Sequence, residues 1–230
     1  MATTGHTVKA FDEELGELRG LVLEMGGRAE AAIENSMNAL IHRDIDAAID
    51  VVANDHLINE LEVRIENQAV RLIALRAPLA DDLREIVAVM KIAGQIERVG
   101  DYAKNIGKRV PVIMEHREIE VDQLLITTTR AVRLMMKDVL NAFGTRDPFA
   151  AAEICDRDQV VDDLHNSLFR TLLTRMMEYP FSITAATHLI FVSKNLERIG
   201  DHATNIAEMV YYAATGEHMA ERQHGSDIQL

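Results

Sequence analysis

Two stretches of the chain decide the fold: residues 97–106 read ERVGDYAKNI, and residues 197–206 read ERIGDHATNI. The second stretch lies 100 positions after the first and keeps its Glu, Arg, Gly, Asp, Ala, Asn and Ile. A repeat that preserved only a core would need only its apolar positions, whereas here polar residues also stay in register. The sequence therefore predicts a 230-residue chain built from two copies of one unit.

Helical spacing of apolar residues extends along most of the chain. Ile86, Met90, Ala93 and Ile96, for example, are separated by steps of three and four, which keep one stripe of a helix facing inward. The four prolines mark boundaries, because proline is excluded from helix interiors. The predicted helices span residues 8–41, 45–76, 80–109, 118–143, 148–178 and 182–215.

The fold class predicted from this pattern is all-α, with two tandem three-helix bundles related by the internal repeat. A second, weaker repeat on the second helix of each group supports this fold class, since residues 55–61 (DHLINEL) align with residues 158–164 (DQVVDDL). We expect one bundle over residues 1–113, a second over residues 114–216, and a polar tail over residues 217–230. Long helices with short connections should form an elongated body whose broad faces suit partner proteins.

Composition narrows the class of partner. The chain has 37 Asp and Glu against 24 Lys and Arg, a net charge of −13 that disfavours direct binding to nucleic acid or anionic lipid. The single cysteine, Cys155, excludes an internal disulfide and a cysteine-based zinc site. The sequence shows no signal-peptide pattern and no apolar run long enough to span a bilayer. We therefore expect a cytoplasmic protein that meets membranes only through partner proteins.

Rows of acidic residues carry the chemistry of the repeat. Glu97 and Asp101 are four residues apart and share one helix face, as do Glu197 and Asp201. Like charges at this spacing destabilise a helix by a few tenths of a kcal/mol, and a multivalent cation would remove that cost. The candidate metal ligands are Glu97, Asp101, Glu197 and Asp201, joined by Asp55, Asn59, Asp158 and Asp162 from the second helices and by Asn105 and Asn205 at the row ends.

Oxygen ligands favour a hard cation such as Mg²⁺, Ca²⁺ or Mn²⁺, or iron, and argue against zinc. His165 and His202 are possible nitrogen donors, although a surface or structural role is the commoner one for a lone histidine. An alternative without metal stays open, in which the acids are solvated or paired along the helix with neighbouring bases. Those bases are Arg98, Lys104, Lys194 and Arg198.

The sequence gives little support to an enzyme. Helical di-iron and di-manganese oxidases need Glu-x-x-His on two helices, and this chain has one such pattern, Glu221 to His224, in the polar tail. Neither a phosphate-binding Gly-rich loop nor a Gly-x-Ser-x-Gly nucleophile motif is present. We therefore predict no catalytic residue and no organic cofactor, and a role in binding or sensing.

Residues 196–208 (LERIGDHATNIAE) closely resemble the PhoU family of regulators that are accessory to bacterial phosphate-specific transport. Residues 96–106 resemble the other repeat of that family, and residues 55–62, 81–86 and 211–216 give further matches, so the resemblance covers nearly the whole chain. It implies paired three-helix bundles whose Glu/Asp-x-x-x-Asp segments bind metal ions, in some members as multinuclear iron clusters. Asn59 departs from the family pattern, which implies a metal site in the first half that is weaker or holds fewer ions.

The resemblance also implies a function. PhoU-like proteins are non-enzymatic negative regulators that link the cytoplasmic ATPase subunit of the phosphate transporter to a sensor histidine kinase. By this resemblance we expect a homodimeric cytoplasmic adaptor, held at the inner membrane by its partners, that keeps phosphate-starvation genes off when phosphate is plentiful. Two alternatives remain: a metal-storage or metal-phosphate-binding helical protein, and a PhoU-like regulator of another transporter.

Overall fold

The computed structural model describes residues 3–116 and 123–219, with side chains from residue 11 onward. Within these ranges the chain is helical and contains no strand, as the sequence predicts. The elements are α1 (Thr3–His42), α2 (Ile45–Asn54), α3 (His56–Arg76), α4 (Asp81–Gly107), α5 (Val110–Met114), α6 (Gln123–Thr145), α7 (Pro148–Cys155), α8 (Asp158–Glu178), the 3-10 turn η1 (Pro180–Ser182) and α9 (Ile183–Thr215).

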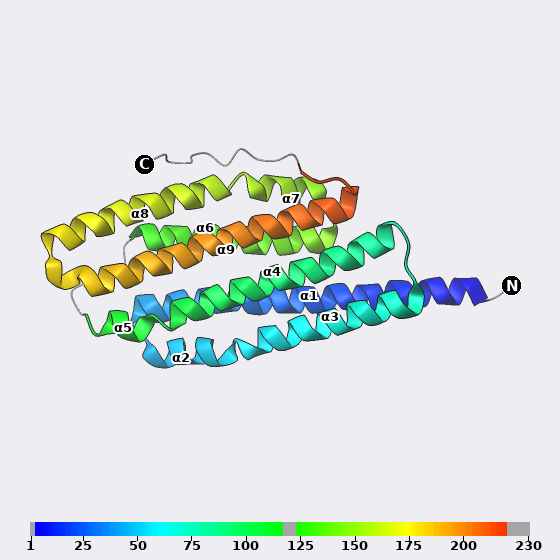
Figure 1. Ribbon diagram of the computed structural model, residues 1–230, viewed down its shortest axis with the longest axis horizontal. Coiled ribbons are helices and arrows are strands. Elements are labelled where there is room, and N and C mark those ends of the chain that lie inside the picture. The colour runs from blue at the N-terminus through cyan, green and yellow to red at the C-terminus, as the bar shows by residue number, and fades with distance from the viewer. Residues whose placement is uncertain (1–2, 117–122, 220–230) are drawn as a thin grey trace.

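Two three-helix bundles lie side by side in an elongated body (Figure 1). The first consists of α1, the α2–α3 pair and α4, and the second consists of α6, the α7–α8 pair and α9. They meet where α4 packs along α9 and where α1 packs against α6. The predicted pair of repeated bundles is confirmed, and the repeated stretches on α4 and α9 lie at the contact between the bundles.

Helix α4 buries three of the four residues that the spacing pattern indicated, Ile86, Ala93 and Ile96, while Met90 is partly buried against the core. On α4, Ile92, Ile96, Val99 and Ala103 are completely buried, in steps of three and four. Burying an aliphatic side chain of this size stabilises a fold by about 1.5–3 kcal/mol. The core is therefore continuous along α4.

The prediction of unbroken helices over residues 45–76 and 148–178 is wrong. The first is interrupted at Asp55, which separates α2 from α3, and the second at residues 156–157, which separate α7 from α8. Asp55 keeps helical backbone angles (φ −57°, ψ −34°), but its carbonyl accepts from Ile58 N at 3.0 Å in a tighter turn. Neither break contains Pro or Gly, so the sequence carried no signal for it.

The turn that precedes each broken pair is also repeated. Arg43 and Arg146 both adopt positive φ, 57° and 56°, at the ends of α1 and α6. In each copy an aspartate follows and caps the next helix: Asp44 accepts from a backbone amide at 2.9 Å, and so does Asp147. The shared Arg-Asp pair, 103 residues apart, extends the repeat to a turn that the sequence reading did not identify.

The predicted domain boundary at residue 113 falls inside α5 and stays a prediction. The start of the helix predicted at 118 and most of the tail, including Glu221 to His224, lie outside the described residues. Among the described helices, none combines the length and the apolar character that a membrane crossing needs.

Candidate functional site

The two repeated stretches hold their carboxylates at matching depth. The side chain of Glu97 is 17% exposed and that of its counterpart Glu197 is 13% exposed. The second acids agree as closely, at 33% for Asp101 and 34% for Asp201. The repeat therefore extends from the sequence to the burial of its acidic side chains.

The two stretches also touch each other. Tyr102 and His202 occupy the same place in the two copies, and their rings stack with centroids 5.4 Å apart. Gln95 of α4 joins this contact: its Oε1 lies 2.6 Å from His202 Nδ1 and accepts from Asn205 Nδ2 at 3.2 Å. Asn205 thus makes a hydrogen bond between the bundles, and Asn105 lies half-buried at the matching position of α4.

The first acidic cluster consists of Asp55, Glu62, Glu97, Asp101 and Lys104. Asp55 Oδ2 accepts from Lys104 Nζ at 2.6 Å, and the same ammonium group lies 3.4 Å from Asp101 Oδ1. Burial raises the pKa of Glu97, and the neighbouring carboxylates of Asp101 and Glu62 raise it further. The cluster brings three of the predicted ligands together, and a lysine contacts two of them.

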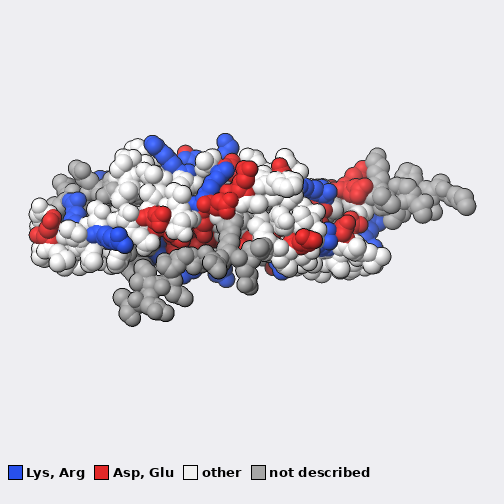
Figure 2. Space-filling model, turned by 90° about the horizontal axis from the view of Figure 1, so that it is seen from above, with Lys and Arg blue, Asp and Glu red and all other residues white. Residues whose placement is uncertain are grey.

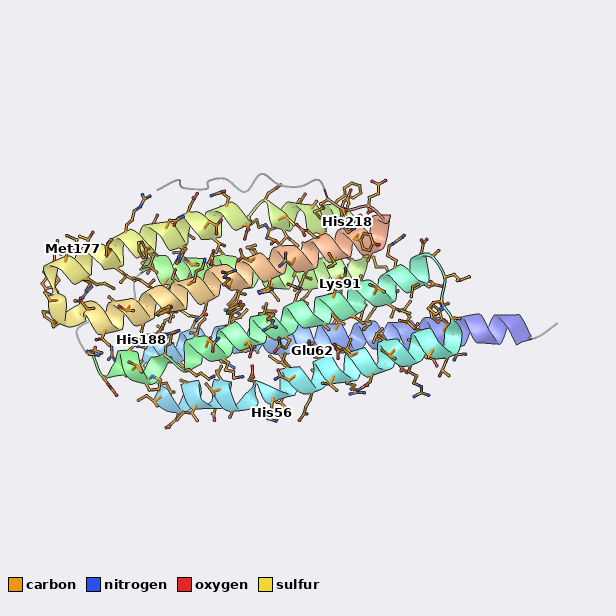
Figure 3. The ribbon with its side chains drawn as sticks, viewed as in Figure 1. His56, Glu62, Lys91, Met177, His188 and His218 are labelled. Carbon is orange, nitrogen blue, oxygen red and sulfur yellow. The ribbon has the colours of Figure 1, made fainter. Side chains whose placement is uncertain are left out.

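Glu62 is a member that the sequence reading missed. Burial raises its pKa first, and the nearby carboxylates of Glu66 and Asp101 add to that effect. Figure 3 shows Glu62 where α3 faces α4. Asn59, the predicted donor, is instead exposed. The sequence spacing could have indicated Glu62, because a residue seven places after Asp55 lies on the same helix face.

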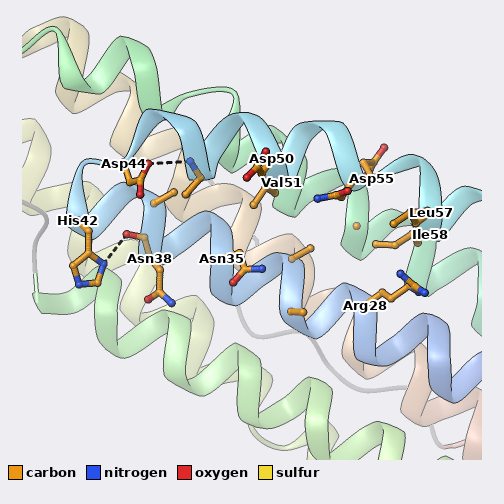
Figure 4. Close-up of a pocket in the computed structure, with 16 residues that line it drawn as sticks. Arg28, Asn35, Asn38, His42, Asp44, Asp50, Val51, Asp55, Leu57 and Ile58 are labelled. Atoms are coloured by element: carbon orange, nitrogen blue, oxygen red, sulfur yellow. Dashed lines mark hydrogen bonds between the residues drawn. The ribbon is translucent and has the colours of Figure 1, made fainter.

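A groove about 540 Å³ in volume runs between α1 and the α2–α3 pair, and Asp55 of the first cluster lines it (Figure 4). Asn35 and Asn38 line it from α1, and Asp50 lines it from α2. Asp55 and Gly100 also line it, near the end where Arg28, Leu57 and Ile58 lie. The groove therefore reaches one residue of the first cluster, Asp55.

The second acidic cluster surrounds a cleft of about 460 Å³ between α8 and α9. It is formed by Asp158, Asp162, Lys194, Glu197 and Asp201. Burial raises the pKa of Asp201 to about 6, and the Glu197 and Asp162 carboxylates contribute in the same direction. Lys194 Nζ donates to Glu197 Oε1 at 2.6 Å, but its side chain is 43% exposed and lies at the rim of the cleft.

One further group, the imidazole of His165, adjoins this cleft. His165 Nδ1 lies 2.8 Å from Ser193 Oγ, and burial lowers the pKa of His165, which favours the neutral imidazole that metal ions bind. Burial also raises the pKa of Asp162, and the Glu197 carboxylate adds to the rise. The predicted donors of α8 and α9 therefore face one cleft.

The two clusters differ in their fit to a metal ion. In the described part of the chain, no three or more His, Cys, Asp and Glu side chains are arranged so that together they could hold a metal ion. In the first cluster an ammonium group occupies the place between Asp55 and Asp101, so these two residues do not fit a cation. In the second, the counterpart of Lys104 is Thr204, whose Oγ1 donates to the carbonyl of Asp201 at 2.7 Å, and the carboxylates suit a hard cation.

Comparison with known proteins supports the architecture. The PhoU domain family matches residues 22–110 and 126–210, one match for each bundle. The phosphate-specific transport system accessory protein PhoU homolog of Zymomonas mobilis is 52% identical over 224 residues, which cover 97% of this chain and 94% of that protein. The homolog from Caulobacter vibrioides is 45% identical over 226 residues, 98% of each chain.

Two solved structures share the fold. PhoU from Pseudomonas aeruginosa has a TM-score of 0.86 and 36% sequence identity, with 90% of this chain and 100% of that chain covered. The phosphate transport system regulatory protein PhoU from Streptococcus pneumoniae has a TM-score of 0.86 and 28% identity, with coverage of 92% and 100%. With a domain match in each bundle and relatives similar over nearly their full length, this chain belongs to the PhoU family.

Proposed function

We propose that this protein is a non-enzymatic negative regulator accessory to phosphate-specific transport, which couples the transporter's cytoplasmic ATPase subunit to a sensor histidine kinase. The observation that carries the proposal is the match to accessory proteins of phosphate-specific transport systems, at 52% identity over 97% of this chain. The match covers both bundles and both acidic clusters, so the whole chain is available for the same task. In this role the protein keeps phosphate-starvation genes off when phosphate is plentiful.

An exposed apolar surface supports a task of binding proteins. At the turn from α8 through η1 into α9, Met177 is 78% exposed, Phe181 is 60% exposed, and Tyr179 and Ile183 are about half exposed. Figure 3 shows Met177 at this end of the molecule. Grouped apolar side chains on a surface mark sites of protein association. Figure 2 shows acidic and basic side chains mixed on the face seen there, with wide uncharged areas between them.

We also propose that a metal ion binds in the second acidic cluster. Its oxygen donors would be Asp162, Glu197 and Asp201, with Asp158 and the neutral imidazole of His165 adjoining them. This set suits Mn²⁺, Mg²⁺, Ca²⁺ or iron, the last being the metal that the family resemblance implies, and it does not suit zinc. A bound cation supplies positive charge between α8 and α9, which stabilises the form of the protein that holds these helices together.

The location and assembly follow from the same role. We propose a cytoplasmic homodimer that reaches the inner membrane through the transporter and the kinase and binds no nucleic acid directly. Light scattering after size-exclusion chromatography tests the assembly. A mass of twice the 25.7 kDa of one chain supports the dimer, and a mass of 25.7 kDa contradicts it.

The regulatory role is tested in the source bacterium with its own copy of the gene deleted. The readout is a reporter of phosphate-starvation genes at high phosphate. We expect the wild-type protein to restore repression, and Phe181→Ser to weaken it if the apolar turn binds a partner. Phe149→Ser is the matched control, because Phe149 is 79% exposed on α7, away from that turn. A wild-type protein that leaves the reporter on contradicts the proposal.

The same assay separates regulation from metal storage, which the carboxylate-lined cleft of the second cluster also suits. The informative variant is Glu197→Gln combined with Asp201→Asn. If it loses bound metal and also loses repression, metal binding is part of regulation. If it loses metal and represses as well as the wild type, the cleft serves storage of metal or of metal-bound phosphate, and our regulatory account of the metal is wrong.

A further inference from the structure

Lys104 is placed as a cation would be placed. Its Nζ lies 2.6 Å from Asp55 Oδ2 and 3.4 Å from Asp101 Oδ1, so one ammonium group joins the acid of the broken helix pair to the acid of α4. The Asp55 side chain is 5% exposed, and its Oδ1 has no hydrogen-bond partner among the described residues. A carboxylate this buried needs a positive partner, because removal of the partner leaves an uncompensated charge in the interior.

Asp55 Oδ1 faces the close approach of the two helices. A Cβ added to Gly100 would lie 3.7 Å from this oxygen and 2.8 Å from Ile58 Cδ1. The missing side chain at residue 100 therefore leaves the Asp55 carboxylate next to the backbone of α4. The ammonium group of Lys104 thus lies between two carboxylate oxygens that could otherwise bind a cation, Asp55 Oδ2 and Asp101 Oδ1.

The repeat shows what the other half has at the same place. The ammonium group of Lys104 is replaced there by the hydroxyl of Thr204, which turns back to its own helix and donates to the Asp201 carbonyl at 2.7 Å. The lysine near the second cluster, Lys194, corresponds to Gly94 and contacts Glu197 from the rim. The two copies thus share their acidic residues but differ in where the protein places its own positive charge.

We infer that Lys104 is a built-in cation that takes the place of a metal ion in the first acidic cluster, so that only the second cluster binds an exchangeable metal. The first bundle then carries a fixed ion pair between α4 and the α2–α3 break, whatever the metal supply. The second bundle responds to metal. The inference about the second cluster rests on the proposed function, whereas the role of Lys104 does not.

The test exchanges the two residues and counts bound Mn²⁺. Each protein is stripped with a chelator, dialysed against Mn²⁺ and analysed for metal per chain. We expect Lys104→Thr, which copies the second half, to bind one Mn²⁺ more than the wild type. Asp55→Asn added to this variant should remove the gain. Thr204→Lys, which copies the first half, should bind one Mn²⁺ fewer than the wild type.

Lys91→Thr is the matched control, because Lys91 is an exposed residue of the same helix, outside the cluster (Figure 3). Its Mn²⁺ content should equal that of the wild type. Helicity by circular dichroism shows whether each variant is folded. Lys104→Ala, which introduces a better helix former, replaces Lys104→Thr if the threonine variant does not fold.

The difference between Lys104→Thr and the wild type decides the inference. A folded variant that binds no more Mn²⁺ than the wild type overturns it, and so does a wild type that already loses one Mn²⁺ on Asp55→Asn. The wild-type content decides the metal part of the proposed function separately. A wild type without Mn²⁺ contradicts that part, while a gain in Lys104→Thr still supports the role of Lys104.

Discussion

Asp201→Asn should stabilise the metal-free protein at neutral pH. Burial and the Glu197 and Asp162 carboxylates raise the pKa of Asp201 from 3.8 to about 6, so the folded state disfavours its charge. A rise of about two pKa units corresponds to about 3 kcal/mol at 1.36 kcal/mol per unit. The side chain is 34% exposed, so screening by solvent reduces this free energy by roughly half, and we expect a stabilisation of about 1–2 kcal/mol.

The pH dependence gives the sign of the effect. The folded state holds the Asp201 proton more tightly than the unfolded chain, so this group adds stability as pH falls through about 6, and the gain is complete below the unfolded pKa of 3.8. Asparagine mimics the uncharged form at every pH. The advantage of the variant should therefore be full at pH 8, smaller at pH 5, and close to zero near pH 4.

The assay is urea unfolding of both proteins in a chelator between pH 8 and pH 4.5, followed by circular dichroism. Asp101→Asn is the matched control, since Asp101 holds the same place in the first half but accepts from Lys104 at 3.4 Å. Loss of that ion pair should cost up to about 1 kcal/mol. Our reasoning is refuted if Asp201→Asn is less stable than the wild type at pH 8, or if its advantage does not change with pH.

Three further results are expected. Gly27→Ala should stabilise the protein by about 1 kcal/mol, because the added Cβ meets no atom within 4 Å. Gly26→Ala should destabilise it by about 1–3 kcal/mol, because the added Cβ would lie 2.7 Å from Leu140 Cδ1. Thermal unfolding of the two variants measures both effects. Cys155 is 1% exposed, so a bulky thiol reagent should label it at least about 100-fold faster in urea than in native buffer, as mass spectrometry would show. Mn²⁺ at about 100 times its Kd should raise the unfolding free energy by about 2.7 kcal/mol, and Asp162→Asn should reduce the rise, as urea titrations would measure.

The helices and the repeat could be predicted because both depend on the spacing of residues that are close in the sequence. The acid pairs on α4 and α9 follow from four-residue steps, and the structure gives Glu97 and Glu197 nearly equal burial. The break at Asp55 could not be predicted, since it involves no Pro or Gly, and the ion pair that Asp55 makes there joins it to a residue 49 positions away, Lys104. Contacts between distant residues also decided that Glu62, and not Asn59, faces the first cluster.

The difference between the two clusters has a consequence for how the bundles communicate. The rings of Tyr102 and His202 stack between the repeated stretches, so α4 and α9 are in direct contact beside both clusters. If Lys104 fixes the first cluster, α4 keeps one position relative to α3. Metal would then alter only the spacing of α8 and α9, on either side of the second cleft. A ligand shifts a protein only by binding two of its forms unequally. Metal would then act on the second bundle against a first bundle of fixed geometry, which is the arrangement that an adaptor with one responsive half requires.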